Sequence, residues 1–484
     1  MRVCFICAEY APYAKTGGLG DVAAALTAEL VRAGHEVLCF VPLHGQINLR
    51  GARVEPVEAL QRVAIGIGAR EFVYDVRCAR RPGSPAAVHL IDCPPLFDRP
   101  QLYSDAPDEY LRYLMLTRAA LECCQRLGFA PDIVHCNDWH TALAPLLLRA
   151  TYAWDAQIFG RTKCVFTIHN IGYQGSFPAD HLPDLGPVVG RNLLHQADLA
   201  AGWINPMRHG VMYADAVTTV SPTYAREIRT PAAGFGLDGD LRARGDAVVG
   251  ILNGADYAVW NPATDPYLPH NYDQEDMSGK ALNKLALTDL LRLGGAAGSP
   301  LLGMVTRLTA QKGIDLVMQV LPALIETREL RFVALGNGET RYERFFEDLQ
   351  QRFPGRAVFH AGYSEELAHF IEGAADVFLM PSYYEPCGLN QMYSLRYGTV
   401  PLVRRTGGLA DSVQHYDPDS GEGTGVVFND FDAGGLEWAL DTALEWYEWP
   451  ELWNQIIANG MRQDFSWQRA AGEYERLYAS LLAG

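Results

Sequence analysis

The sequence predicts an α/β protein built from two successive doubly wound units. Two observations predict this class. Short apolar runs recur along the chain, and segments with helical spacing of apolar residues separate most of them. The alternation weakens once, after Asn253, and then begins again. Strands that alternate with helices form parallel sheets covered on both faces, so we expect two such sheets.

The first series of elements opens with an apolar run at 3–8, which reads as a buried strand. Val22, Leu26 and Leu30 then follow at helical spacing, and Gly34 ends that helix. A further helical pattern spans 109–128. The other strands predicted in this series are 36–42, 87–92, 132–136, 163–169, 216–221 and 248–254.

A stretch rich in Pro, Asn, Asp and aromatic residues follows Asn253 and predicts a loop at a domain boundary. The second series of strands is then predicted at 301–306, 331–336, 356–362, 376–382 and 399–405. We expect two Rossmann-like domains, 1–253 and 254–455, that face each other across a deep cleft. The C-terminal segment, 456–484, is helical in pattern, and we expect it to pack back on the first domain.

The composition narrows the classes of function. The chain has 484 residues, with 40 Lys and Arg against 57 Asp and Glu, so its net charge is −17. A hydrophobic share of 49% and a charged share of 20% are globular values and exclude general disorder. The negative balance argues against nucleic acid and anionic membranes as partners. A local group of cations could still bind a small anionic substrate.

Cysteine usage and hydropathy favour a cytoplasmic setting. Ten cysteines lie between Cys4 and Cys387, mostly in apolar runs typical of buried thiols rather than of disulfides. Cys4 and Cys7 form a C-x-x-C pattern, but no helix begins there, which disfavours a redox motif. No signal-peptide pattern begins the chain, and no uncharged apolar run reaches about 18 residues, so we expect no membrane span.

Ligands of open α/β sheets bind at the carboxyl ends of the strands, so residues just after each strand are the candidates for chemistry. Lys15 and Gly18 lie in a glycine-rich loop that enters a helix, where amides and a cation favour an anion, although a plain turn is an alternative. Asp138 and His169 are polar groups at strand ends. A buried structural histidine is the alternative for His169. The histidines lack zinc-type spacing.

The second series carries a comparable set of residues. Arg307 and Lys312 follow a strand and suit a diphosphate, although two exposed surface cations are the alternative. Tyr363 could stack on a flat base or lie at the edge of the core. Glu385 lies in a constrained turn between aromatic residues and Pro386, and a capping role is its alternative. Gly336 and Gly338 lack the third glycine of a dinucleotide fingerprint, which disfavours a nicotinamide cofactor.

Taken together, these segments resemble the bacterial glycogen synthase and plant starch synthase family, retaining glucosyltransferases of GT-B architecture. The matching segments run in family order over nearly the whole chain: KTGGLGDV at 15–22, HCNDWHT at 135–141, FTIHNIGYQG at 166–175, SPTYAREI at 221–228, ILNGADYAVWNPATD at 251–265, TRLTAQKGIDL at 306–316 and EPCGLNQMYSLRYGTVPLVRRTGGLADSV at 385–413. Two positions depart from the family pattern. Asn390 stands where Thr is common, and Ala255 stands where Ile is usual.

The resemblance implies transfer of glucose from ADP-glucose to the non-reducing end of an α-1,4-glucan, with retention of configuration. It implies catalytic roles for Glu385, His169, Arg307, Lys312 and Asp138. It places Lys15, Gly18, Asn253, Tyr363, Cys387, Gly388 and Leu389 near the donor. Fixed cations can stabilise a leaving diphosphate, so we expect neither a metal nor another cofactor.

Two other readings stay open from the sequence. One is a different nucleotide-sugar-dependent transferase of the same architecture, with another donor or acceptor. The other is a catalytically silent protein that binds glucan without consuming a nucleotide sugar. A nicotinamide-dependent dehydrogenase is a more distant third. The sequence does not choose between a covalent intermediate and a same-face mechanism of retention.

Overall fold

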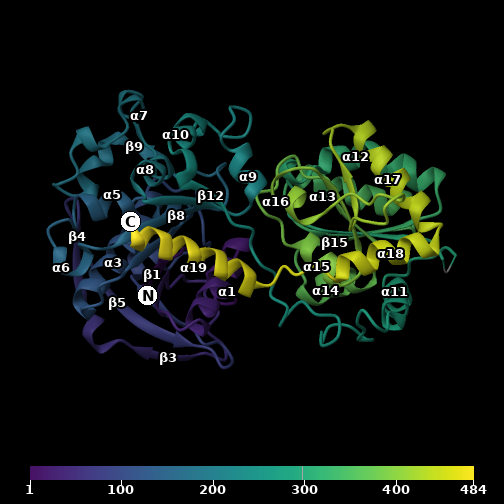
Figure 1. Ribbon diagram of the computed structural model, residues 1–484, viewed down its shortest axis with the longest axis horizontal. Helices are drawn as coiled ribbons and strands as arrows, with labels where there is room; N and C mark the ends of the chain where they lie inside the picture. The colour runs from purple at the N-terminus through teal and green to yellow at the C-terminus, as the bar shows by residue number, and fades with distance from the viewer. Residues whose placement is uncertain (297) are drawn as a thin grey trace. The chain divides into compact units, whose positions relative to one another are not determined.

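The computed structural model describes residues 1–296 and 298–484 (Figure 1). The chain forms two compact units, which we describe separately. The first comprises Met1–Asn253 together with Trp467–Gly484, and the second comprises Gly254–Ser466. The second unit is therefore an insertion between two pieces of the first.

The first unit is built on a ten-stranded sheet in the order β12-β11-β8-β7-β1-β2-β6-β5-β3, with β4 paired to β5. The strands from β12 to β6 are parallel neighbours. Their bounds are β1 (Arg2–Ile6), β2 (Glu36–Pro42), β6 (Ala87–Asp92), β7 (Ile133–Asn137), β8 (Lys163–Ile168), β11 (Ala216–Thr219) and β12 (Val248–Gly250). These strands confirm the predicted first series, although β12 is shorter than predicted.

One edge of this sheet departs from the prediction of parallel strands. There β3 (Arg53–Pro56) and β4 (Val63–Ile67) each pair antiparallel with β5 (Arg70–Arg80), which itself runs antiparallel to β6. The prediction missed all three strands. Residues 63–67 alternate between buried and exposed, as expected where one face of a sheet meets solvent. A small hairpin, β9 (Phe177–Pro178) with β10 (Trp203–Ile204), lies apart from the sheet.

Helices connect the strands of the first unit (Figure 1). They are α1 (Gly18–Arg32), α2 (Pro94–Phe97), α3 (Glu109–Leu127), α4 (Asp138–Thr141), α5 (Ala144–Arg149), α6 (Ala156–Phe159), α7 (Gln196–Ala200), α8 (Pro206–Tyr213), α9 (Pro222–Glu227), α10 (Asp238–Ala243) and α19 (Trp467–Ala483). The last helix packs against α1, and its Trp467, Tyr474 and Tyr478 join the core around β1.

The predicted C-terminal segment began at residue 456, and the structure corrects this boundary. The helix α18 (Pro450–Met461) belongs to the second unit, because Trp453 and Ile456 are buried in that unit's core. Only the chain from Trp467 onward joins the first unit.

The second unit has a six-stranded parallel sheet in the order β15-β14-β13-β16-β17-β18. Its strands are β13 (Leu301–Val305), β14 (Arg331–Gly336), β15 (Ala357–Ala361), β16 (Val377–Met380), β17 (Val400–Arg404) and β18 (Val426–Phe428), of which the prediction missed β18. Its other helices are α11 (Ser278–Leu290), α12 (Ile314–Thr327), α13 (Thr340–Arg352), α14 (Glu365–Ala374), α15 (Asn390–Arg396), α16 (Gly407–Ser412) and α17 (Ala433–Tyr447).

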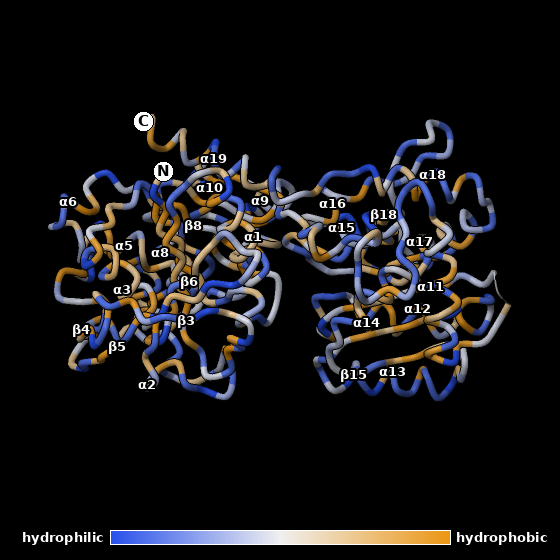
Figure 2. Tube along the Cα trace, turned by 90° about the horizontal axis from the view of Figure 1, so that it is seen from below, coloured by the Kyte–Doolittle hydropathy of each residue, from blue (hydrophilic) through white to orange (hydrophobic). Residues whose placement is uncertain are grey.

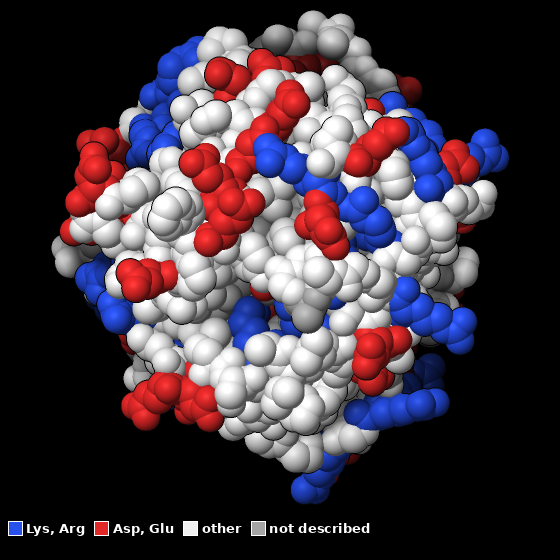
Figure 3. Space-filling model, turned by 90° about the vertical axis from the view of Figure 1, so that its right-hand side faces the viewer, with Lys and Arg blue, Asp and Glu red and all other residues white. Residues whose placement is uncertain are grey.

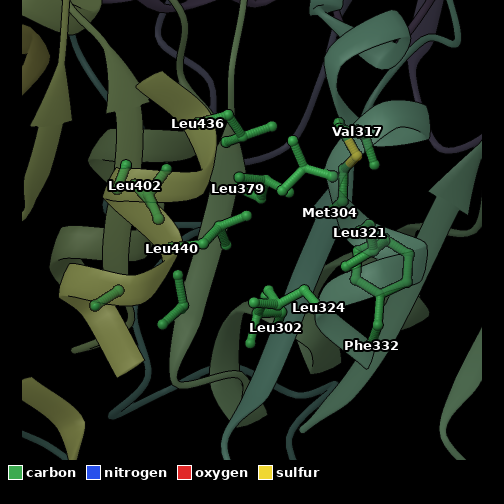
Figure 4. Packing of buried hydrophobic residues seen from close by; sticks show 14 of the residues in the cluster. Leu302, Met304, Val317, Leu321, Leu324, Phe332, Leu379, Leu402, Leu436 and Leu440 are labelled. Atoms are coloured by element: carbon green, nitrogen blue, oxygen red, sulfur yellow. The ribbon is translucent and has the colours of Figure 1, made fainter. Parts of the chain in front are cut away.

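Apolar side chains cover both faces of the second sheet. On one face, Leu321 of α12 and Leu440 of α17 pack with Leu302 and Leu379 of the central strands (Figure 4). A separate cluster, which includes Leu287 of α11 and residues of α14, covers the other face. In both units hydrophobic residues follow the strands and inner helix faces, and hydrophilic residues follow the outer loops (Figure 2). The alternating strands and helices of both units confirm the predicted α/β class.

Acidic and basic side chains are interspersed on the face of the molecule shown in Figure 3. None of the described helices has the length and apolar character needed to cross a membrane. The ten cysteines are free thiols, and nine of them are buried.

Candidate active site

The candidate residues of the first unit lie just beyond the carboxyl ends of β1, β7, β8 and β12. The loop after β1 carries Lys15 and leads into α1, which begins at Gly18. The Nζ atom of Lys15 lies 2.8 and 3.0 Å from the two carboxylate oxygens of Asp21, one turn into the helix. A Cβ atom at Gly20 would lie 2.8 Å from Cβ of Lys15, so this glycine permits the close approach of loop and helix. The ammonium group is thus held beside the first turn of α1.

Glu9, near the start of the same loop, fixes the loop through hydrogen bonds to Thr16. This residue was not predicted from the sequence. Its side chain is buried. One carboxylate oxygen accepts the backbone N–H of Thr16 at 2.8 Å, and the other accepts the Thr16 hydroxyl at 2.8 Å and the Tyr103 hydroxyl at 2.5 Å. A buried carboxylate with this many donors is strongly held. Glu9 and Tyr103 therefore position the glycine-rich loop.

His169, at the end of β8, is held by Asn137, the last residue of β7. The Asn137 amide donates to the carbonyl of Ile6 at 3.1 Å, which turns its side-chain oxygen toward Nε2 of His169 at 3.0 Å. Burial lowers the pKa of His169 to about 3, so the ring is neutral at physiological pH. Nε2 must then carry the proton and donate it to Asn137, which leaves Nδ1 as an acceptor for a ligand hydroxyl.

Asp138 is the most unusual residue of this group. Its backbone is left-handed, with φ of 57°, and its side chain is buried. Burial raises the pKa of Asp138 to about 8, against the opposing effect of the backbone N–H groups of Asn170, Trp139 and His169. Among the described residues, Oδ1 of Asp138 and Oδ1 of the buried Asn253 find no hydrogen-bond donor. A strained residue and unsatisfied buried oxygens are typical of binding sites.

In the second unit two separately predicted residues, Lys312 and Glu385, come together. The Lys312 Nζ atom lies 2.5 Å from Oε2 of Glu385, and the Ser382 hydroxyl donates to the same oxygen at 3.0 Å. Both side chains are largely buried, with 17% of Lys312 and 7% of Glu385 exposed. Arg307, after β13, is exposed at the same edge of the sheet. This edge thus combines two cations with one fixed carboxylate.

Backbone contacts hold the loops that carry this pair. Gly313 has φ of 72°, and a Cβ atom there would lie 1.9 Å from the Pro381 carbonyl oxygen. The Tyr383 N–H donates to the Gln311 carbonyl at 2.8 Å, which joins the loop after β13 to the loop after β16. The Gly408 N–H donates to the Glu385 carbonyl at 3.1 Å. Glu385 is therefore fixed through its main chain as well as through its side chain.

The segment from Cys387 to Leu389 leads from Glu385 into α15. Gly388 has φ of 71°, and Cys387 lies against Gly408, where an added Cβ atom would be 2.1 Å from the Cys387 carbonyl oxygen. The Asn390 side chain donates to the Val305 carbonyl at 3.0 Å, so this departure from the family pattern anchors α15 to the end of β13. Ala255, the other departure, is buried where its N–H meets the Phe465 carbonyl at 2.7 Å.

Tyr363 lies two residues beyond β15, and 64% of it is exposed. Between β15 and β16 lie β14 and β13, so the strand that leads to Tyr363 and the strand that leads to Glu385 are three spacings apart. At roughly 4.8 Å per spacing this is about 14 Å. Arg307 and Lys312 follow β13, between the two. The order along this edge is therefore aromatic ring, cations and carboxylate.

Gly336, the last residue of β14, and Gly338, two residues later, permit close packing of the backbone. A Cβ atom at Gly336 would lie 1.9 Å from the Thr306 carbonyl oxygen, and one at Gly338 would lie 2.2 Å from that of Leu308. The structure thus gives a packing reason for both glycines. A search of the described residues for groups of three or more His, Cys, Asp or Glu side chains that could hold a metal ion found none.

Family models match both units. A starch synthase catalytic domain model matches residues 2–243, and a group 1 glycosyl transferase model matches residues 293–463. A glycogen synthase of Anaeromyxobacter dehalogenans (strain 2CP-C) is 44% identical over 99% of this chain and 100% of its own length. The chain belongs to the starch and glycogen synthase family. It is therefore a glycosyltransferase of GT-B architecture.

Further similar proteins support this assignment. A glycogen synthase of Myxococcus xanthus (strain DK1622) is 43% identical over the full length of both chains. The catalytic domain of Starch Synthase IV from Arabidopsis thaliana, solved bound to ADP and acarbose, is 36% identical, with a TM-score of 0.92 over 100% of this chain and 99% of that chain. A sucrose-phosphate synthase from Thermosynechococcus elongatus, 18% identical with a TM-score of 0.62, shares the fold.

Proposed function

We propose that this glycosyltransferase is a glycogen synthase that transfers glucose from ADP-glucose to the non-reducing end of an α-1,4-glucan, with retention of configuration. The observation that carries the proposal is the arrangement of Tyr363, Arg307, Lys312 and Glu385 along one edge of the second sheet. A nucleotide sugar presents a base, a diphosphate and a sugar in that same order.

In this proposal the second unit holds the donor. Tyr363 stacks on adenine, Arg307 and Lys312 neutralise the diphosphate, and Glu385 lies beside the glucose. The amides of Cys387, Gly388 and Leu389 contact the phosphate and sugar. In the first unit Lys15 and Gly18 contact phosphate, and His169, Asp138 and Asn253 bind glucose hydroxyl groups. Nδ1 of the neutral His169 suits this role because it can accept a hydrogen bond from a glucose hydroxyl group.

The chemical demand on the site is negative charge that develops on the leaving diphosphate. Cations held in place before the reaction stabilise that charge without reorganisation. Lys312 is such a cation, because Glu385 fixes its position. Arg307 supplies a second positive charge and follows β13, as Lys312 does. We propose that these cations make a divalent metal unnecessary. The same carboxylate of Glu385 can stabilise positive charge that develops on the glucose ring.

ADP-glucose is favoured as donor because a starch synthase at 36% identity was solved with ADP, the nucleotide that ADP-glucose releases. The acarbose in that structure supports a saccharide ligand for this enzyme as well. Ten free thiols support action in a reducing compartment such as the cytoplasm.

The decisive experiment measures nucleotide release from ADP-glucose and UDP-glucose in parallel, with glycogen present and EDTA added. Glycogen-dependent release of ADP in EDTA is the expected result. Release of UDP alone would reject the proposed donor, and activity only after Mg²⁺ is restored would reject metal independence. Glycogen binding without release from either donor would reject the synthase in favour of a silent glucan-binding protein.

A further inference from the structure

A surface hollow of about 290 Å³ lies in the first unit, away from the residues discussed so far. Its lining comes from the last turns of α3 and from the loop before α6. Helix α6 is labelled at the left edge of the unit in Figure 1. The lining residues are Glu122, Gln125, Arg126, Trp154 and Asp155. Because α3 ends at Leu127 and β7 begins at Ile133, the hollow lies toward the amino ends of the strands. The candidate active-site residues follow the carboxyl ends.

Trp154 is the most conspicuous side chain of this hollow, because 75% of it is exposed. Its loop is nevertheless firmly held. Tyr152, two residues earlier, is buried against Phe159, and its hydroxyl donates to Glu122 at 3.3 Å. Asp155, the next residue, caps α6 through the Ile158 N–H and accepts the Gln125 amide at 2.7 Å. The fold therefore presents a large aromatic face to solvent from a fixed support.

The chemistry of the lining narrows the class of ligand. Two carboxylates, from Glu122 and Asp155, disfavour an anion, and Arg126 disfavours a cation. Carboxylate, amide and guanidinium groups together suit a neutral ligand with many hydroxyl groups. The exposed indole supplies a flat apolar face against which a sugar ring can pack.

We propose that the hollow around Trp154 is a second binding site for an α-glucan chain, which tethers the polymer to the enzyme. This inference rests on the proposed glycogen synthase function, which supplies a branched polymer as ligand. One glucan particle can occupy the active site and this hollow through different chains. Such a second attachment raises the effective concentration of chain ends without any contact to the reacting groups.

Affinity electrophoresis in native gels that contain glycogen tests the proposal, with four proteins in parallel: the parent, Trp154→Ala, Trp154→Tyr and Trp449→Ala. Trp449 is the matched control, because it is 64% exposed and does not line this hollow. We expect Trp154→Ala to weaken glycogen binding roughly 3- to 10-fold, since one of two attachments is lost. Trp154→Tyr keeps an aromatic face and is expected to bind nearly as the parent does, as is Trp449→Ala.

A short acceptor provides the second readout. Maltotetraose is too short to reach two sites at once, so we expect the kcat/KM of Trp154→Ala on maltotetraose to equal that of the parent, while the KM for glycogen rises. Equal glycogen retardation of Trp154→Ala and the parent would overturn the tether. So would a loss shared by Trp449→Ala, or a change of oligomeric state in Trp154→Ala on sedimentation. Absence of transfer by the parent would instead reject the proposed function.

Discussion

Lys312 and Glu385 form a largely buried ion pair, so substitution of either residue leaves the other without its charged partner. Removing Glu385 leaves the Lys312 ammonium largely buried beside Ser382, without its carboxylate. In the proposed mechanism, removing Lys312 takes a fixed cation from the leaving diphosphate. The two losses act on the same chemical step, so their effects should not add.

We predict that Glu385→Ala and Lys312→Ala each lower kcat roughly 10²- to 10³-fold, the usual scale for one electrostatic group. The rate of nucleotide release at saturating donor measures this. Glu366→Ala is the control, because Glu366 is an exposed carboxylate in the first turn of α14. A kcat near that of the parent in either variant would remove that residue from the mechanism.

The raised pKa of Asp138 predicts how the stability of the enzyme depends on pH. Its pKa is about 8 in the folded enzyme, against an ordinary value of 3.8, so between these values the folded state binds the extra proton. Stability from this group is complete below about pH 4 and falls as pH rises to about 8. Asn has the same shape, tolerates φ of 57° and does not titrate.

We therefore expect Asp138→Asn to gain stability over the parent progressively between pH 4 and pH 8, and to show no further gain above that. The difference between the two Tm values, recorded by scanning calorimetry across this range, is the measurement. A difference that stays constant with pH would show that Asp138 ionises normally in the folded enzyme.

At the scale of elements, the loop between β1 and α1 depends on a buried carboxylate near its start, that of Glu9. We predict that Glu9→Ala lowers kcat/KM for the donor roughly 10- to 100-fold, because the loop that we propose to contact phosphate would lose productive geometry on a shift of about 1 Å. Tyr103→Phe should have a smaller effect, since Thr16 still holds the carboxylate. Glu71→Ala, at an exposed position of β5, is the control. Unchanged kinetics in Glu9→Ala would show that the loop holds its shape without this anchor.

The sequence predicted most of the strands that carry the site, because buried parallel strands appear as continuous apolar runs. The edge strands from Arg53 to Arg80 were missed because half-exposed strands leave only a weak alternation. Lys312 and Glu385 could be predicted because each follows an apolar strand and matches a family segment. Glu9 follows a strand too, but nothing in the sequence links it to Thr16 and Tyr103. Such partners become visible only once the chain is folded.

The whole first unit depends on the last helix of the chain. Tyr478 on α19 contacts Nδ1 of the buried His135 with its hydroxyl at 2.7 Å, and Thr167 occupies Nε2 at 2.6 Å. Burial lowers the pKa of His135 to about 3, so the neutral ring offers one donor and one acceptor, and each has a partner.

We predict that Tyr478→Phe lowers the stability of the first unit by about 1–3 kcal/mol, the cost of one buried polar atom left without a partner. Leu482→Ala, on a more exposed part of the same helix, should have little effect. Deletion of 467–484 should expose the apolar face of α1 and cause aggregation. Urea unfolding followed by fluorescence tests the substitutions, and equal midpoints for Tyr478→Phe and the parent would contradict the prediction.

The split of the first unit into Met1–Asn253 and Trp467–Gly484 has a consequence for synthesis on the ribosome. The second unit is one continuous piece of chain and can fold as soon as Ser466 has emerged. The first unit, although its synthesis starts earlier, still lacks the 17-residue helix that covers α1. Its apolar face must stay uncovered while more than two hundred residues are translated. The part of the enzyme that is made first is thus the last to be completed, and during that interval its uncovered apolar surface favours aggregation.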